Sequence, residues 1–144
     1  MTEVPFRRES LGYLVNHVAR LFEHSLAVAI APYGVVPGQF AQLLALFEED
    51  GLTQRELCDR VNIGQATMAN TLKRMQRDGL VRSDPDPNDG RRIRVHLTEH
   101  ARSVERQLIA AASAVNAAAT AGLTEAEVDA YLKVTARLID NLDA

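Results

Sequence analysis

The sequence predicts a mainly α-helical fold with one small β-hairpin (α+β), and three patterns carry this prediction. Apolar residues recur at three- and four-residue spacing along most of the 144 residues, which is typical of amphipathic helices. Two of the helical stretches meet at the short turn sequence NIG, residues 62–64. Two alternating apolar stretches flank the sequence PDPNDG, residues 85–90, which favours a hairpin. No repeat or linker divides the chain, so we expect one domain, 1–144.

Two helices are expected at the start of the chain. The first covers residues 11–30, where the apolar residues form one stripe, and it is closed by Pro32. The second opens near Pro37, because proline suits the first turn of a helix, and it ends at Asp50-Gly51.

The next two helices form a helix-turn-helix pattern. The third begins with a capping-box sequence, in which Glu56 follows Thr53 by three residues, and it runs to about Val61. The fourth starts near Gln65 and is stopped by Gly79, a residue that suits the left-handed position after a helix.

Two helices are expected after the hairpin. Thr98 caps the fifth helix, which is rich in alanine and continues to about Ala121 before Gly122 breaks it. A second capping box, Thr124 with Glu127, opens the last helix. The apolar stripe of that helix has heptad-like spacing and comprises Val128, Tyr131, Leu132, Thr135, Leu138, Ile139 and Leu142.

The net charge of −3 conceals a basic middle segment. Residues 53–94 carry nine Lys and Arg against six Asp and Glu, whereas the segments on either side are both acidic. A local basic patch steers binding to a polyanion, so the overall sign does not exclude DNA. The N-terminus lacks the apolar run of a signal peptide, and no stretch is long and apolar enough for a membrane helix. With a single cysteine and no internal disulfide, we expect a soluble, cytoplasmic protein with no membrane partner.

The fourth helix has one apolar and one polar face. Met68, Leu72 and Met75 fall within one narrow sector, which is expected to face the core. The opposite sector and its margins hold mostly side chains that can reach base edges and phosphates in a major groove, together with one small alanine: Gln65, Ala66, Thr67, Asn70, Lys73, Arg74 and Arg77. A solvated polar face, which most surface helices have, is the alternative interpretation.

The hairpin favours the nucleic-acid interpretation. Arg91 and Arg92 stand beside its turn, and arginine is attracted to narrow minor grooves. Asp89 lies two residues before Arg91, so its carboxylate can pair with the guanidinium and orient it.

The segment from Leu52 to Arg102 resembles the MarR (multiple antibiotic resistance regulator) family, and the flanking helices extend the likeness over the whole chain. The sequence DPNDGR followed by VHLT is similar to the family's pattern Asp-Pro-x-Asp-x-Arg…Val-x-Leu-Thr, and RDGLV is similar to the junction that precedes it. Two positions depart from the pattern: Gly90 stands where many relatives carry a basic residue, and Ala101 stands where glycine is usual.

The resemblance implies a winged helix-turn-helix regulator of transcription, most simply a repressor of a pseudo-palindromic double-stranded DNA operator. Arg91 matches the arginine of the hairpin, or wing, that borders the minor groove, and Asp89 matches the acid that positions it. We expect the following residues to contact or position DNA: Thr53, Gln54, Gln65, Ala66, Thr67, Asn70, Thr71, Lys73, Arg74, Arg77, Asp89, Arg91 and Arg92.

A homodimer and a small effector are further implications of the resemblance. Segments 1–31 and 98–144 would form the dimer, and 37–97 would form the DNA-binding lobe, so that two recognition helices lie about 34 Å apart. A small aromatic or anionic effector would bind between these parts and release the DNA. The candidate lining residues are His17, Arg20, Tyr33 and Phe40, each of which has ordinary packing or surface exposure as its alternative role.

Other functions find less support in the sequence. His17 and His24 are seven residues apart, but two histidines make a poor zinc site, and we expect neither a metal nor another cofactor. Cys58 is expected to be a buried structural residue rather than a redox sensor. No residues assemble into a catalytic site, so we do not expect an enzyme. A winged helix that docks an acidic protein remains the rival function, although such a surface would more often carry aromatic side chains.

Overall fold

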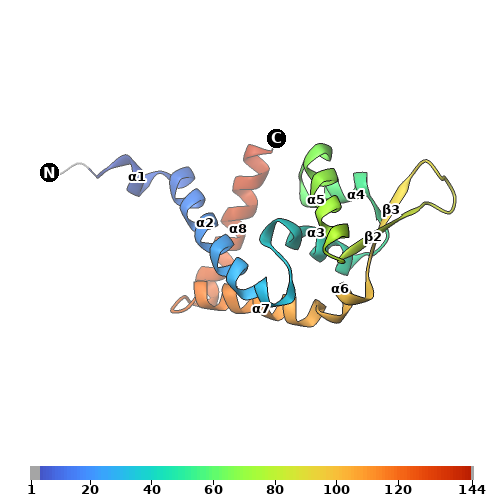
Figure 1. Ribbon diagram of the computed structural model, residues 1–144. Helices are drawn as coiled ribbons and strands as arrows, with labels where there is room; N and C mark the ends of the chain where they lie inside the picture. Colours follow the sequence, from blue (N-terminus) through green and yellow to red (C-terminus); the bar gives the residue numbers. More distant parts are fainter. Residues whose placement is uncertain (1–3, 144) are drawn as a thin grey trace.

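The computed structural model describes residues 4–143 and divides them into two regions joined by a long helix. The elements in chain order are α1 (Phe6–Glu9), α2 (Leu11–Ile30), η1 (Ala31–Tyr33), α3 (Pro37–Glu48), β1 (Leu52–Thr53), α4 (Gln54–Val61), α5 (Gln65–Arg77), β2 (Val81–Pro85), β3 (Ile93–Leu97), α6 (Glu99–Ser103), α7 (Glu105–Ala119) and α8 (Glu125–Leu142). Figure 1 shows α3, α4, α5 and the hairpin together at the right, α2 and α8 at the left, and α7 running beneath both.

The predicted helix boundaries are set by side-chain caps. Thr53, Thr98 and Thr124 each accept a hydrogen bond from the backbone N–H three residues later, at 3.1–3.2 Å. Glu127 returns the bond to the N–H of Thr124 and completes the predicted capping box, whereas Glu56 bonds the hydroxyl of Thr53 instead. These caps confirm the predicted starts of α4, α6 and α8.

The hairpin belongs to a three-stranded antiparallel sheet with the order β1-β3-β2. Val81 pairs with Leu97 at the base of the hairpin, and Pro85 pairs with Ile93 near its tip. The two-residue strand β1, which was not predicted, pairs with β3 and joins the sheet to the start of α4. We call residues 81–97 the wing.

The fifth predicted helix is wrong in one respect: it is two helices, α6 and α7, rather than one from 98 to 121. The chain leaves helical geometry at Val104, where φ is −106° and ψ is 3°. On one side of this break α6 contacts β3 and buries Ala101 completely, while on the other side α7 lies along α2. The break therefore lets one alanine-rich segment serve two packing partners.

The core lies under the helix-turn-helix unit. Met68, Leu72 and Met75 of α5 are at most 5% exposed, which confirms the predicted core face. They pack with apolar residues of α3 and of the sheet, such as Leu43 and Val95. Burial of these side chains fixes the rotation of α5 and thereby decides which of its faces meets solvent.

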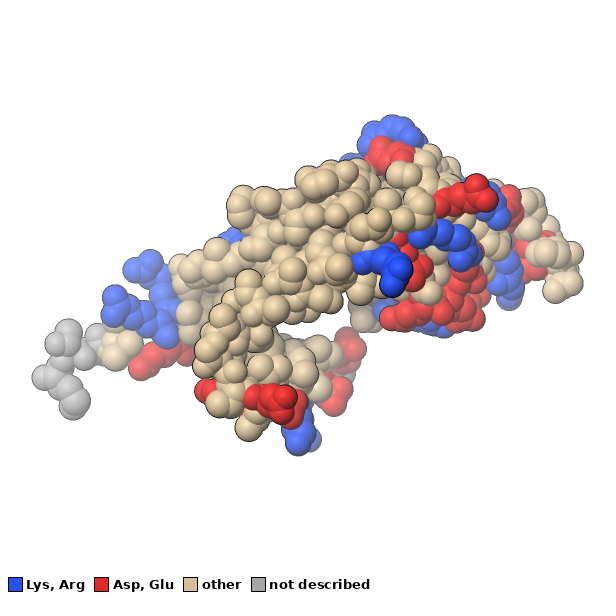
Figure 2. Space-filling model, turned by 90° about the horizontal axis from the view of Figure 1, so that it is seen from below, with Lys and Arg blue, Asp and Glu red and all other residues tan. Residues whose placement is uncertain are grey.

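The helices α2 and α8 leave apolar side chains in solvent. The most exposed include Leu11, Val15 and Leu21 on α2, and Tyr131, Leu132 and Ile139 on α8, which are 56–68% exposed. Figure 2 shows a broad area without charged side chains across the centre of the molecule, while charged side chains gather over the lobe at the right. Monomeric proteins rarely expose many large apolar side chains on neighbouring turns of a helix, so α2 and α8 are typical of helices that form an interface.

No single helix among residues 4–143 has the length and apolar character needed to cross a membrane. The helices Leu11–Tyr33 and Pro37–Glu48 meet at 71°, and they reach that length and apolar character only when the two are counted together.

Candidate DNA-binding surface

The outer face of α5 carries most of the predicted DNA-contacting residues. Burial of Met68 and Met75 on the opposite face turns this side of the helix to solvent. The exposed residues of this face are Gln65, Ala66, Thr67, Asn70, Lys73, Arg74 and Arg77. The structure thus brings amides, a hydroxyl and three cations onto one helix face, the groups that read base edges and phosphates.

Three further predicted residues lie around this face. Thr71 is half-buried on α5. The Gln54 side chain at the start of α4 reaches towards the backbone oxygen of Gln65 at 3.5 Å, which joins the two helices of the motif. Thr53 is only 8% exposed and its hydroxyl is engaged by Glu56, which gives it a capping role. It also lies at the edge of a hollow between α4 and the wing.

The wing holds Arg91 and Arg92 in solvent beside this surface. The Arg91 side chain is 97% exposed, and its Nε lies 3.7 Å from Oδ1 of Asp89. The same carboxylate oxygen accepts the backbone N–H of Arg91 at 3.1 Å. Asp89 therefore contacts the Arg91 guanidinium at ion-pair distance, as the two-residue spacing predicted, and it also holds the Arg91 backbone through a hydrogen bond that was not predicted.

A buried carboxylate that no sequence pattern indicated organises the loop of the wing. Asp86 is 6% exposed and accepts the Asn88 N–H at 2.8 Å and the Arg94 Nε at 3.0 Å. The Asn88 N–H is the largest cause that holds the pKa of the Asp86 carboxyl below its usual value, outweighing the burial that would raise it. Arg94 also donates to the backbone oxygen of Gly51 at 2.8 Å. The wing loop is thus tied to the turn that precedes strand β1.

Positive charge on this surface is largely available to a partner. Among residues 4–143, Arg77 pairs with Asp78 at 3.2 Å, whereas Lys73, Arg74 and Arg92 form no ion pair. An open hollow of about 550 Å³ separates the starts of α4 and α5 from the wing, and Gln54, Gln65, Arg91 and Arg92 are among its lining residues. Two acids, Glu56 and Asp59, also line the hollow and limit how positive it is.

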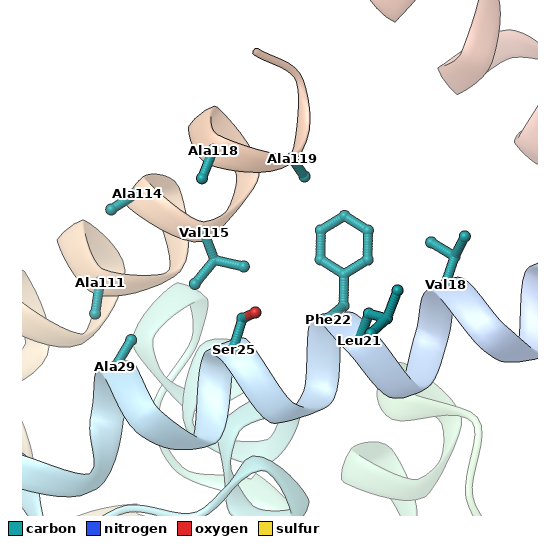
Figure 3. Close-up of a pocket in the computed structure, with 10 residues that line it drawn as sticks. All are labelled: Val18, Leu21, Phe22, Ser25, Ala29, Ala111, Ala114, Val115, Ala118 and Ala119. Atoms are coloured by element: carbon teal, nitrogen blue, oxygen red, sulfur yellow. The ribbon is translucent and has the colours of Figure 1, made fainter.

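Two further hollows lie along α2 and α7, away from the outer face of α5. The first, which we call the α2–α7 hollow, has a volume of about 790 Å³, and Figure 3 shows alanines of α7 facing Val18, Phe22 and Ser25 of α2 across it. The second, which we call the α3 hollow, has a volume of about 530 Å³ and lies between α2, α7 and the start of α3.

The predicted effector residues agree with these hollows only in part. Phe40 lines the α3 hollow. His17 and Arg20 are exposed on α2 and line neither hollow, and Tyr33 packs against the core. The hollows are lined mostly by alanines and aliphatic residues, together with Phe22 in both and with Glu23, Phe40 and Asn116 in the α3 hollow. Which of these residues line a hollow depends on how the helices are arranged, and the sequence pattern alone does not give that arrangement.

The remaining candidate residues have no visible role in binding. Cys58 is 7% exposed, and burial, followed by the neighbouring Asp59 carboxylate, raises the pKa of its thiol. Such a thiol is a poor nucleophile, which fits a structural residue. Within residues 4–143, no three His, Cys, Asp or Glu side chains are grouped so that they could hold a metal ion.

Comparisons with known proteins agree with this geometry. The model of the MarR family matches residues 33–92. The HTH-type transcriptional regulator TtmR of Methylorubrum extorquens is 28% identical over 134 residues, which cover 93% of this chain and 68% of the relative. The HTH-type transcriptional repressor NicR of Pseudomonas putida is 30% identical over 103 residues, 72% of this chain and 65% of the relative.

A solved structure extends the likeness to the complete fold. The PcaV transcriptional regulator of Streptomyces coelicolor, solved in complex with its natural ligand, superposes with a TM-score of 0.81 and is 28% identical. The match covers 97% of this chain and 98% of that protein. These relatives are regulators of transcription rather than enzymes.

Proposed function

Because this chain belongs to the MarR family of transcriptional regulators, we propose that it is a repressor that binds a pseudo-palindromic operator as a homodimer. In this proposal α5 enters the major groove and Arg91 reaches the adjacent phosphates or minor groove. A small effector then releases the protein from DNA. The protein works in the cytoplasm, beside the DNA, and has no enzymatic role.

The outer face of α5 is the observation that carries the proposal. Apart from the small Ala66 its side chains are polar, all are exposed, and none is aromatic. Lys73 and Arg74, which form no ion pair within residues 4–143, lie on the same side as Asn70. A surface for docking an acidic protein would be expected to carry aromatic anchors instead. Amides beside cations suit a duplex, because the amides read bases while the cations neutralise phosphates.

The exposed apolar residues of α2 and α8 support the homodimer. We assign the dimer contacts to residues 1–31 and 98–144, and the DNA contacts to 37–97. The α2–α7 hollow is lined by apolar side chains except for Ser25, so a partner helix such as α8 can fill it. Two-fold symmetry then presents two α5 helices to successive major grooves.

The α3 hollow is the proposed effector site, since it is the one that borders both α2 and the first turn of α3. Phe22, Phe40 and Leu44 give it apolar walls, and Asn116 offers an amide for a polar substituent. Its lining residues include Glu23 but no Lys or Arg, so an aromatic effector fits better than a strongly anionic one.

A footprint on the DNA beside the protein's own gene tests the proposed function. We expect two protected half-sites with centres about 10 base pairs apart, one turn of B-DNA, which matches two recognition helices in a dimer. Protection of a single half-site would contradict the homodimer on DNA, and the absence of any sequence-dependent protection would contradict operator binding.

A further inference from the structure

A buried glutamine joins the wall of the α3 hollow to the end of α5. Gln39 is 3% exposed and lies in the first turn of α3. Its neighbours Pro37, Gly38 and Phe40 all line the α3 hollow. Its Oε1 accepts the N–H of Val36 at 3.2 Å, which fixes the side chain to the start of the helix. Any movement of this turn therefore moves the amide of Gln39.

The other end of the Gln39 side chain holds the residue that follows α5. Its Nε2 donates to Oδ2 of Asp78 at 2.8 Å, a contact between residues 39 positions apart in the sequence. This hydrogen bond is the largest cause that lowers the pKa of the Asp78 carboxyl, so the group stays ionised at neutral pH. A charged acceptor makes the bond stronger than one between neutral groups.

Asp78 in turn holds a cation of the proposed DNA-binding surface. Its second oxygen, Oδ1, accepts a hydrogen bond from Nε of Arg77 at 3.2 Å. The Arg77 side chain is 72% exposed, so its other guanidinium nitrogens face solvent. One carboxylate is thus shared between a buried amide near the hollow and an exposed arginine near the DNA.

We propose that Gln39 is a positioning residue that couples the α3 hollow to DNA binding by holding Asp78 and, through it, Arg77. This inference rests on the proposed function. Occupation of the hollow displaces the first turn of α3 and with it the Gln39 amide. Asp78 then loses its buried donor, and Arg77 loses the fixed direction in which it meets a phosphate.

Substitutions that move the negative charge from residue 78 to residue 39 test whether the hydrogen bond from Gln39 to Asp78 matters for DNA binding. They leave the shapes of the two side chains almost unchanged. In the Gln39→Glu variant two carboxylates face each other, and we expect operator affinity to fall about tenfold, the effect of one hydrogen bond to a charged group. In the double variant Gln39→Glu, Asp78→Asn, the new Asn amide donates to Glu and its oxygen still accepts from Arg77. We therefore expect the double variant to recover most of the affinity.

Gln42→Glu is the matched control. Gln42 is also 3% exposed on α3, but in the orientation that its surroundings favour, its amide donates only to the backbone oxygens of Gly38 and Gln39. This variant carries the same substitution at the same depth without touching Asp78, so its thermal unfolding reports the general cost of a buried carboxylate. A fall in affinity of equal size in Gln39→Glu and Gln42→Glu, or a double variant without recovery, overturns the inference.

A larger side chain in the wall of the α3 hollow tests whether occupation of the hollow acts on DNA binding through Gln39. A Cβ added at Gly38 meets no heavy atom within 4 Å, and Gly38 lines the α3 hollow, so we expect the larger side chain of Gly38→Leu to extend into the hollow. We expect this variant to weaken operator binding at least about threefold, and we expect no such effect when Gln39→Ala is already present, because the coupling is then broken. Equal effects in both backgrounds, or none in either, overturn the inference.

The wild-type protein separates this inference from the function on which it rests. If the wild type fails to bind its operator, the proposed function and the inference both fail. If the wild type binds and the Gln39 variants behave like it, only the inference fails.

Discussion

At the scale of single residues, Asp86 has the clearest structural task. It is a nearly buried carboxylate in a loop that has no apolar core of its own, and its partners are a backbone N–H and the Arg94 guanidinium. The tip of the wing therefore depends on one charged group rather than on packing. The positions of Arg91 and Arg92, the proposed DNA contacts of the wing, therefore depend on Asp86.

We expect Asp86→Ala to loosen the wing and weaken operator binding about tenfold while the helices remain folded, because the N–H of Asn88 and Arg94 lose their shared acceptor. Fluorescence anisotropy with labelled operator measures the affinity. Asp84→Ala is the control, since Asp84 pairs with Arg82 on the stem of the wing and is 47% exposed. Equal losses in the two variants would argue against a special role for Asp86.

The same residue gives the wing a dependence on pH. The folded pKa of Asp86 lies below the ordinary value of 3.8, so its contribution to stability is complete above pH 3.8 and is lost as the pH falls through the lowered folded value. Near neutral pH, where a repressor works, the carboxylate is fully charged and the wing keeps its shape.

At the scale of elements, Thr98 fastens α6 to the turn that follows α5. Its hydroxyl accepts the N–H of Ala101 at 3.1 Å and donates to the backbone oxygen of Gly79 at 2.6 Å. We expect Thr98→Ala to lower the free energy of unfolding by about 1–2 kcal/mol, the usual cost of a lost helix cap with an added tertiary bond. Urea denaturation of the wild type and the variant measures this difference in the free energy of unfolding. Thr120→Ala is the control, because that hydroxyl bonds only to nearby backbone oxygens at the end of α7.

Local signals in the sequence predicted most elements, since caps and apolar spacing act within a few residues. Thr53, Thr98 and Thr124 mark true helix starts, and Met68 and Met75 mark the buried face of α5. The outward face of α5 follows from its buried face, which is why the proposed contacts could be predicted as a set.

Features that depend on distant partners could not be predicted. The strand β1 has two residues and exists only through its pairing with β3, more than forty positions away. The break at Val104 arises because α6 and α7 pack on different elements, and the bond from Gln39 to Asp78 spans 39 positions. The effector candidates show the same dependence: His17 and Arg20 have suitable chemistry but are exposed on α2 and line neither hollow, whereas Phe40 lines the α3 hollow. Their part in effector binding stays a prediction.

At the scale of the whole molecule, the exposed apolar residues of α2 and α8 indicate that a single chain needs a partner to cover these two helices. We expect Leu132→Glu to convert a dimer into a monomer of 15.8 kDa in analytical ultracentrifugation, because a charge at a 59% exposed leucine would be buried without a partner on association. Operator affinity should fall by about tenfold or more, since one half-site is released. Lys133→Ala, at the neighbouring exposed position, is the control, and we expect this variant to sediment as a dimer like the wild type.

The central claim is that the outer face of α5 and the wing together recognise DNA. The measurement that tests it most directly is a salt titration of binding to DNA from beside the protein's own gene and to a scrambled duplex of equal length, for the wild type, Arg91→Ala and Arg137→Ala. We predict tight, sequence-selective binding whose salt slope decreases by about one per protomer in Arg91→Ala and is unchanged in Arg137→Ala, on the remote helix α8. Weak binding that is equal on both duplexes, with the same slope in all three proteins, would contradict the claim.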